Sequence, residues 1–190
     1  MLEITEIQTR LDDQFLPLEP MLTGFRLLPS EVTKEDIEHL QHQLNTVLPE
    51  QFESMLRRFD FGRFTIGPIA FCNTGDFLAW LCENNQDGSA NEYPWWGSGA
   101  RPSDLLLIAN SDPYAVLLNC KAGLVSVFKH SESWNDHMIV VADAFEPFIR
   151  GLGTTFLERN EQGGNSSLAD EVSNEVGGGR GNAFWRWFAE

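Results

Sequence analysis

The sequence predicts an α+β fold, with a mainly antiparallel sheet and helices packed on one side of it. Three observations predict this class: a pair of amphipathic helical patterns before residue 60, short apolar runs between residues 104 and 130, and another helical pattern after them. Short apolar runs bounded by turn residues are typical of buried strands. Strands that are grouped in sequence and flanked by helices indicate helices on one face of an antiparallel sheet.

The first thirty residues show no sustained hydrophobic periodicity. Pro17, Pro20 and Pro29 would interrupt a long helix here, because proline lacks the backbone donor and clashes with the preceding turn. We therefore expect residues 1–30 to form an irregular or partly helical N-terminal extension.

Two helices joined at a proline follow this extension. Thr33 and Asp36 have the spacing of a capping box, and apolar residues then recur at helical spacing as far as Leu48. Pro49 ends this helix and can begin the next one, whose apolar residues continue to about Phe59.

Weaker signals follow the helix pair. Residues 64–72 are a strand candidate that the Gly67-Pro68 pair interrupts, because a proline belongs at a strand edge or a bulge. A short helix is predicted over residues 76–82, capped by Thr74 or Asp76.

The centre of the sheet is predicted by three apolar runs that form a meander. Residues 105–109, 114–118 and 124–130 read as successive strands, and the glycine in residues 119–123 suits a hairpin connection. Residues 137–141 read as a fourth strand. The β-branched and aromatic residues of these runs suit a pleated surface.

The last helix predicted from periodicity begins after Asp143, which we expect to cap it. Its apolar face includes Phe145 and Phe148, and we expect it to end near Gly151 or Gly153, since glycine is favoured just after a helix.

The C-terminal residues have an unusual composition. Residues 160–182 are rich in Gly, Ser, Asn and Glu, which predicts a flexible Gly-rich tail that does not pack. The aromatic segment at residues 182–190 must bury its aromatic side chains. It can do so on its own domain, or in a partner or second copy of the chain.

The charge of the chain limits its partners. With 28 acidic and 13 basic residues, the formal net charge is −15. Phosphate groups require Lys and Arg, so nucleic acid and anionic membranes are disfavoured as partners. An acidic surface steers basic proteins, although it also serves ordinary solubility. The N-terminus lacks a signal-peptide pattern and no stretch is long enough to span a bilayer, so we expect a cytoplasmic protein.

No motif in the sequence indicates catalysis. The cysteines, Cys72, Cys82 and Cys120, include no Cys-x-x-Cys pair, which disfavours a disulfide framework and a zinc site. His39 and His42 lack a His-Glu-x-x-His pattern and read as part of a solvated helix face. Neither a nucleophile elbow nor a phosphate-binding loop is present. We expect no catalytic residue, no cofactor and no metal, while the many carboxylates leave a glycosidase-like pair open by counting alone.

Several pieces of the chain occur in a recognisable order. They are the helix pair that contains Ile37, Leu48-Pro49 and Phe52, the Phe59-Asp60-Phe61-Gly62 turn, residues 104–109, Gly123-Leu124-Val125, and residues 142–149. In order and spacing they resemble the SUKH superfamily, the Smi/Knr-like proteins, over about residues 30–157. The chain departs from that family at Asp60-Phe61-Gly62, where the family tends to have an Asn-Gly turn.

The resemblance implies both a domain plan and a function. The plan is a SUKH-like domain over residues 31–158, preceded by the extension at residues 1–30 and followed by the Gly-rich linker and aromatic segment at residues 159–190. The implied function is that of an immunity protein, which neutralises a cognate polymorphic toxin, often a nuclease, without catalysis of its own. Some eukaryotic relatives imply an alternative, a regulatory scaffold that binds proteins, here with the aromatic segment as its recognition element.

The polar loop over residues 83–103 contains our candidate contacts with a protein partner. Aromatic side chains supply much of the energy at interface centres, and acidic side chains nearby could pair with Arg or Lys of a basic nuclease. Trp134, from the polar loop at residues 131–136, joins them. The alternative is that Trp95 and Trp96 simply cover the sheet. The predicted partner-binding residues are Asp87, Glu92, Tyr93, Trp95, Trp96 and Trp134.

Overall fold

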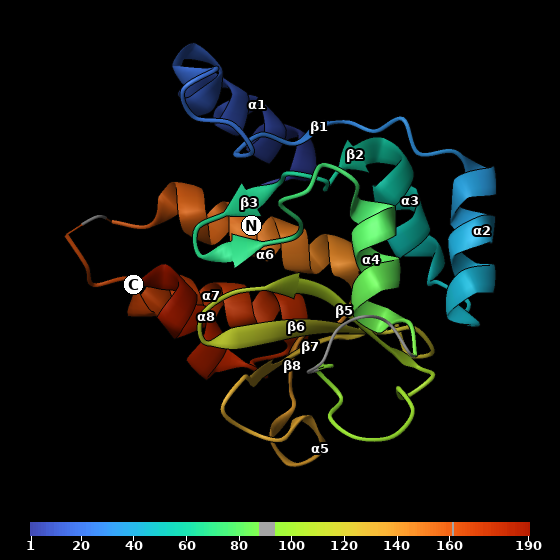
Figure 1. Cartoon of the computed structure of the whole chain (residues 1–190). Helices are drawn as coiled ribbons and strands as arrows, with labels where there is room; N and C mark the ends of the chain where they lie inside the picture. The colour runs from blue at the N-terminus through green and yellow to red at the C-terminus, as the bar shows by residue number, and fades with distance from the viewer. Residues whose placement is uncertain (88–93, 161) are drawn as a thin grey trace.

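A computed structural model describes residues 1–87, 94–160 and 162–190, and they form the predicted α+β fold (Figure 1). In these residues the helices are α1 (Ile4–Phe15), the short 3-10 helix η1 (Leu16–Leu18), α2 (Lys34–Leu44), α3 (Glu50–Arg58), α4 (Phe77–Asn85), α5 (Trp134–His137), α6 (Phe145–Glu158), α7 (Ser166–Gly177) and α8 (Asn182–Ala189). The strands are β1 (Leu28–Pro29), β2 (Phe59–Asp60), β3 (Thr65–Ile66), β4 (Ile69–Ala70), β5 (Leu105–Asn110), β6 (Tyr114–Asn119), β7 (Val125–Lys129) and β8 (Ile139–Ala142).

Six of these strands form one antiparallel sheet in the order β3-β4-β5-β6-β7-β8. The predicted meander is confirmed, since β5 pairs with β6 and β6 pairs with β7 in sequence order. β8 is the predicted fourth strand and pairs with β7. The candidate strand at residues 64–72 is a tight hairpin of β3 and β4, whose turn contains Gly67 at a φ of +54°.

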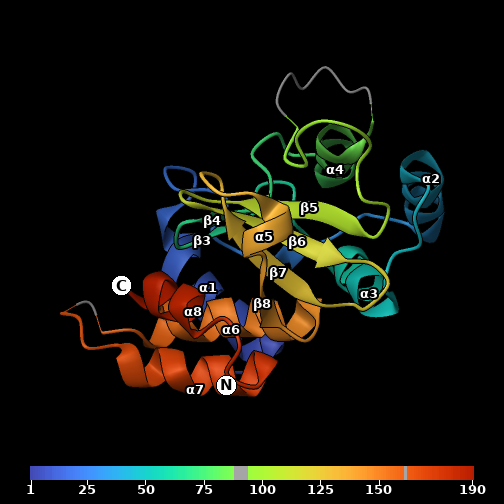
Figure 2. The same cartoon turned by 90° about the horizontal axis from the view of Figure 1, so that it is seen from below.

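The two faces of the central strands belong to different clusters, because successive side chains of a strand point in opposite directions. Leu106, Ile108, Val116 and Leu118 face the main core, where α6, α7 and α8 lie together on one side of the strands (Figure 2). The opposite face carries Leu105, Leu107, Ala115, Leu117 and Phe128, which pack under Trp80, Trp95 and Trp134.

The local signals in the helix pair and in α4 are confirmed. Asp36 and Thr33 form the capping box, with the Asp36 N–H donating to Thr33 Oγ1 at 3.2 Å. Asp76 caps α4 by accepting a hydrogen bond from the Ala79 N–H at 2.9 Å. The first helix of the pair, α2, ends at Leu44 rather than at the predicted Leu48, because Asn45 adopts the left-handed conformation that closes a helix.

The expected N-terminal extension is partly helical. Its helix, α1, is regular over Ile4–Phe15. Ile4, Ile7, Leu11 and Phe15 form one buried stripe in the main core. Pro17 lies in the 3-10 helix that follows and does not interrupt α1. The first fifteen residues therefore contribute to the same core as the sheet.

The prediction that the helix after Asp143 ends near Gly151 or Gly153 is wrong, because α6 continues to Glu158. Both glycines are points of close packing. A Cβ on Gly151 would lie 2.6 Å from the Trp185 ring, and one on Gly153 would lie 2.6 Å from Ile7. Glycine is required here so that α1 and α8 can reach the helix backbone.

Asp143 does not cap α6, contrary to the prediction. The residue that precedes the helix is Ala144, which makes no capping hydrogen bond through its side chain. Asp143 instead forms an ion pair with Arg180, in the turn between α7 and α8. Its carboxylate therefore connects the sheet to the C-terminal helices.

The predicted flexible tail is also wrong, since Ser166–Gly177 form α7. Ala169, Val172 and Val176 recur at helical spacing and are buried in the main core. These few apolar residues suffice for a packed helix in a segment of otherwise polar composition.

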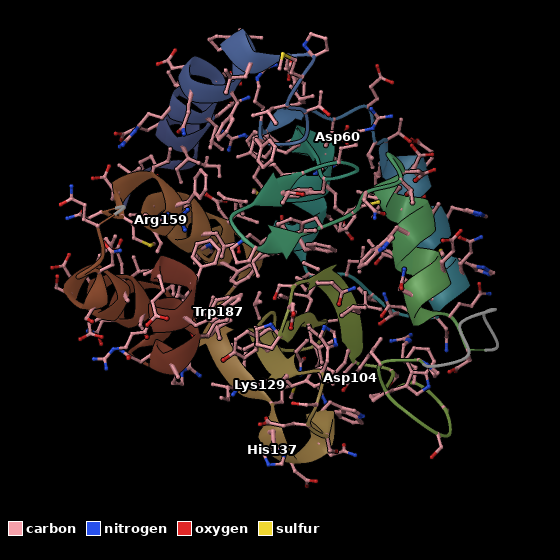
Figure 3. The ribbon with its side chains drawn as sticks, turned by 60° about the vertical axis from the view of Figure 1, so that its left-hand side comes forward. Asp60, Asp104, Lys129, His137, Arg159 and Trp187 are labelled. Atoms are coloured by element: carbon pink, nitrogen blue, oxygen red, sulfur yellow. The ribbon has the colours of Figure 1, made fainter. Side chains whose placement is uncertain are left out.

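The aromatic segment docks on its own domain, one of the two alternatives left by the sequence. Phe184, Trp185 and Phe188 in α8 are each at most 1% exposed. Trp187 lies beside the strands, with its ring centroid 4.8 Å from that of Tyr114 (Figure 3). The segment is thus part of the hydrophobic core.

The C-terminal helices also cover the outer edge of β8. The Trp185 indole N–H donates to the Val141 carbonyl at 3.0 Å, and the Asp143 N–H donates to the Val176 carbonyl at 2.8 Å. A Cβ on Gly181 would lie 2.9 Å from the Val140 carbonyl oxygen, so the turn before α8 contacts the strand directly.

Side chains and loops occupy other exposed sheet edges. The Asn85 amide accepts a hydrogen bond from the Leu107 N–H at 2.7 Å and donates to the Leu107 carbonyl at 2.9 Å, as a neighbouring strand would. At β3, the Thr65 N–H donates to the Gly24 carbonyl at 2.7 Å. Occupied edges of this kind do not offer a template for another strand.

Candidate functional site

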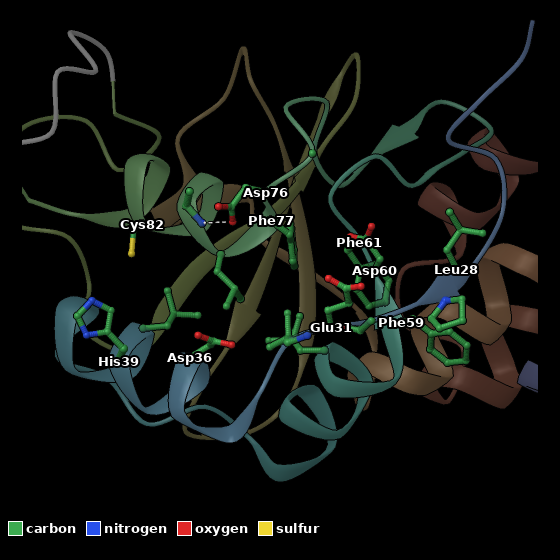
Figure 4. A pocket seen from close by; sticks show the side chains of 18 of the residues that line it. Leu28, Glu31, Asp36, His39, Phe59, Asp60, Phe61, Asp76, Phe77 and Cys82 are labelled. Carbon is green, nitrogen blue, oxygen red and sulfur yellow. Dashed lines mark hydrogen bonds between the residues drawn. The ribbon is translucent and has the colours of Figure 1, made fainter. Parts of the chain in front are cut away.

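A groove with a volume of about 870 Å³ lies between α2 and α4 (Figure 4). Residues 28–32 and the β2 region, whose strands pair with each other, line one end of it, and Leu56 of α3 also contributes to its lining. We call this feature the acidic groove. Its lining residues are Leu28, Pro29, Ser30, Glu31, Val32, Asp36, His39, Leu40, Gln43, Leu56, Phe59, Asp60, Phe61, Gly75, Asp76, Phe77, Leu78, Ala79, Cys82 and Glu83.

The floor of the acidic groove is apolar. Leu40, Leu56, Phe59 and Phe77 reach it from the main core, where each is nearly fully buried. Leu28 also lines the groove and is 40% exposed, which is unusual for a large apolar side chain in this protein. The apolar surface that the groove offers to a ligand therefore comes mainly from partly exposed side chains such as Leu28.

The rim of the groove carries carboxylates from several elements. None of the ion pairs formed by the described residues includes them, and no Lys or Arg lines the groove. Two guanidinium groups lie at its margins: Arg58 stacks on Phe59, and Arg63 lies beside Gly75. The rim carboxylates are Glu31, Asp36, Asp60, Asp76 and Glu83.

Hydrogen bonds fix some of these carboxylates. The Thr33 N–H and hydroxyl donate to Asp36 and lower the pKa of its carboxyl group. Asp60 accepts from the Gly62 N–H at 2.7 Å. The exposed side chains of Glu31 and Glu83 have no hydrogen-bond partner among the described residues. Negative charge is thus held on both walls of the groove.

Cys82 and His39 line the groove from α4 and α2, respectively (Figure 4). A nucleophilic cysteine needs a lowered pKa. Here burial raises the pKa of the Cys82 thiol, with further contributions from Asp76 and Glu83. The thiol donates to Gln43 Oε1 at 3.0 Å. This arrangement keeps the thiol protonated and does not activate it.

The described residues contain no group of three or more His, Cys, Asp or Glu side chains that could hold a metal ion. They also include no helix long and apolar enough to cross a membrane.

The predicted tryptophans lie together on the outer face of the sheet. The Trp95 ring packs edge to face against Trp96 and Trp134, with centroids 5.5 Å and 6.0 Å away. We call these three residues the tryptophan cluster. Asp60, which lines the groove, is well separated from His137, which is in the same short helix as Trp134 (Figure 3). Trp95, by contrast, bonds to Asn85 of α4, the helix whose Cys82 and Glu83 line the groove.

Each indole N–H of the tryptophan cluster has an internal acceptor. Trp95 donates to Asn85 Oδ1 at 3.1 Å, Trp96 to the Gly99 carbonyl at 3.1 Å, and Trp134 to the Trp96 carbonyl at 3.2 Å. Trp96 is 7% exposed, while Trp95 and Trp134 are half-buried. The cluster covers the sheet, and contact of these residues with a partner stays a prediction.

Of the predicted acidic contacts, Asp87 is exposed, and its carboxylate accepts a hydrogen bond from the Arg101 N–H at 2.8 Å. Glu92 and Tyr93 lie outside the residues that the structure describes, so their predicted role is untested.

The family model of the SMI1 / KNR4 family (SUKH-1) matches residues 31–151. The chain belongs to this family. No curated protein matched the chain. The match confirms the resemblance drawn from the order of the helix pair, the meander and the closing helix.

In this SMI1/KNR4-family protein, the acidic groove lies almost entirely within the matched region. Among its lining residues, Leu28, Pro29 and Ser30 precede that region. By contrast, α1, α7 and α8 lie outside it and pack against α6 and the main core. These three helices contribute no lining residue and therefore leave the groove open.

The groove of this SMI1/KNR4 domain was not predicted from the sequence. Asp36 and Asp76 were identified as helix caps, and Phe59-Asp60-Phe61 as a turn. The available signal was the presence of acidic residues at the starts of two helices. The sequence did not show that α2 and α4 face each other across a hollow.

Proposed function

We propose that this SMI1/KNR4-family protein is a non-enzymatic immunity protein that binds and neutralises a cognate toxin. The family includes immunity proteins and provides protein-interaction domains. The observation that carries the proposal is the open acidic groove, which combines apolar floor and carboxylate rim within the matched region. Such a surface suits a basic protein, for example a nuclease whose substrate is anionic.

The charge of the whole chain supports the same partner. A formal net charge of −15 raises the rate at which a basic protein is encountered, most strongly at low ionic strength. The five rim carboxylates then provide a local negative site at which the encounter can end.

The absence of catalysis is part of the proposal. The one cysteine of the groove is a protonated thiol, and it has a hydrogen-bonded amide oxygen rather than a general base as its partner. Turnover of a small molecule by the purified chain, abolished by substitution of groove side chains, would contradict this view.

The alternative, a regulatory scaffold, used the aromatic C-terminal segment as its recognition element. Phe184, Trp185 and Phe188 are buried in the core, so these side chains are occupied inside the fold. This favours the immunity proposal over that form of the scaffold.

The direct test uses the product of the open reading frame immediately upstream, which we expect to end in a toxin domain. Cells that produce this domain should stop growing, and co-production of the chain should restore growth and allow both proteins to be purified together. An unrelated acidic protein is the control, because it separates specific neutralisation from net charge. Growth arrest in the presence of abundant folded chain would refute the proposal.

A further inference from the structure

The acidic groove has a composition that selects one kind of ligand. We propose that it binds a cationic, amphipathic segment of the protein partner, with apolar side chains on the groove floor and Arg or Lys side chains at the rim. This inference rests on the proposed function, in that it assumes a protein partner, and it specifies the chemistry by which that partner is held.

The shape of the groove suits a peptide segment rather than a single ion. Its volume of about 870 Å³ is comparable with that of pockets that enclose whole small ligands, roughly 300–1,000 Å³. Leu28 at 40% exposure and the partly exposed Leu78 present side-chain surface that an apolar residue of the segment would cover. Burial of this surface is favourable at roughly 25 cal/mol per Å².

Electrostatics determine the sign of the ligand charge. The rim carries five carboxylates and no Lys or Arg, so an anionic segment would be repelled. Arginine is especially suitable, because its planar fork can bind a carboxylate through two hydrogen bonds.

The rim carboxylates differ in how freely they can bind a cation. Asp36 and Asp76 lie at the starts of α2 and α4, where the positive end of each helix offsets part of their charge. Glu31 and Glu83 are exposed and make no ion pair among the described residues. These two glutamates are the best positions at which to test the inference, since changing them breaks no side-chain hydrogen bond or ion pair among the residues that the structure describes.

The experiment is a titration of the full chain, followed by amide NMR and by fluorescence anisotropy. The probe is a short labelled peptide that alternates leucine and arginine. One control peptide has glutamate in place of arginine, and the other has glycine in place of leucine. We expect the leucine–arginine peptide to shift the amide signals of groove residues such as Asp60 and Leu78. We expect the control peptides to bind at least about tenfold more weakly.

A matched pair of variants separates a local effect from net charge. Glu31→Gln with Glu83→Gln removes two charges at the rim. Glu132→Gln with Glu171→Gln removes two charges from exposed side chains elsewhere. We expect the dissociation constant of the peptide to rise about tenfold for the rim pair and less than about twofold for the distant pair.

Three results would overturn the inference: an equal loss of affinity in both variants, equal binding of the glutamate peptide, or amide shifts outside the groove, for example at the tryptophan cluster. The toxin assay is interpreted separately. Neutralisation without peptide binding in the groove would refute this inference alone, whereas groove binding by a chain that neutralises no toxin would refute the proposed function alone.

Discussion

The acidic groove and the tryptophan cluster differ in whether their polar groups are bonded within the chain. In the cluster, each of the three indole N–H groups donates to an acceptor within the chain. In the groove, Glu31 and Glu83 are exposed on the rim without an ion pair among the described residues. The aromatic residues of the cluster favoured it as a binding surface in the sequence. The exposed carboxylates of Glu31 and Glu83 favour the groove instead, because they remain available to bond a partner.

Residue type alone does not mark an interface. A tryptophan whose ring and N–H are both satisfied internally stabilises the fold, because its removal leaves a cavity and an unpaired acceptor. An exposed carboxylate beside apolar surface is available to another molecule. The two surfaces should therefore respond to substitution in different ways.

Trp96→Ala should be the most destabilising of these substitutions. Because Trp96 is 7% exposed, its truncation should lower the free energy of unfolding by about 3 kcal/mol. Urea unfolding monitored by circular dichroism measures this change. Trp96→Phe is the matched control, since it keeps most of the ring volume and should cost less. An alanine variant that keeps its stability but no longer neutralises the toxin would instead establish Trp96 as a partner contact.

Asn85→Ala should have the next largest effect. Asn85 is fully buried and bonds both backbone groups of Leu107 as well as the Trp95 indole. Removing it leaves these groups unpaired, at a cost of about 2 kcal/mol or more. Asn84→Ala is the control, because Asn84 makes one local bond to the Trp80 carbonyl. Equal stability of the two variants in urea would show that the edge of β5 does not need Asn85.

Glu31→Gln combined with Glu83→Gln should leave the fold unchanged while weakening a cationic ligand. Exposed substitutions away from packed features change stability by no more than about 0.5 kcal/mol. The same urea measurement checks this. A large loss of stability would show that the rim carboxylates contribute to the fold, and the contrast with the tryptophan cluster would then fail.

The smallest expected effect concerns the pH dependence of stability. The pKa of Asp36 is lowered from its usual 3.8 by the Thr33 hydrogen bonds. The contribution of the Asp36 carboxylate to the free energy of unfolding is therefore fully present above the usual pKa. It is lost as the pH falls through the lower pKa of the folded state. Asp36→Asn keeps an acceptor but cannot titrate, so its stability should fall less on acidification from about pH 4 to about pH 2. Parallel curves for parent and variant would contradict this assignment.

The sequence predicted those parts of the fold that depend on neighbouring residues. The capping box of Thr33 and Asp36, the Asp76 cap and the meander of β5, β6 and β7 follow from local patterns. The order of these elements was sufficient to indicate the family.

The errors came from residues whose role depends on distant contacts. Gly151 and Gly153 were interpreted as a helix end, but they contact Trp185 and Ile7, which lie far away in sequence. Likewise, the buried stripe of α7 is short, and its composition is dominated by the polar residues that face solvent. Local propensity does not include such contacts.

The candidate site shows the same limit. The rim carboxylates come from five separate positions between Glu31 and Glu83, and each has an ordinary local explanation as a cap, turn or exposed residue. Their shared position around a hollow is a property of how α2 and α4 pack. Therefore the groove could be found in the structure and not in the sequence.

The covered edges of the sheet restrict how a partner can be recognised. With the β8 edge beneath α8 and the Leu107 backbone satisfied by Asn85, these strands cannot be extended by a strand from another chain. Recognition must then depend on side chains, which single substitutions can change without altering the backbone. Under the proposed function, a few replacements around the groove would redirect the protein to a new partner while its scaffold persists.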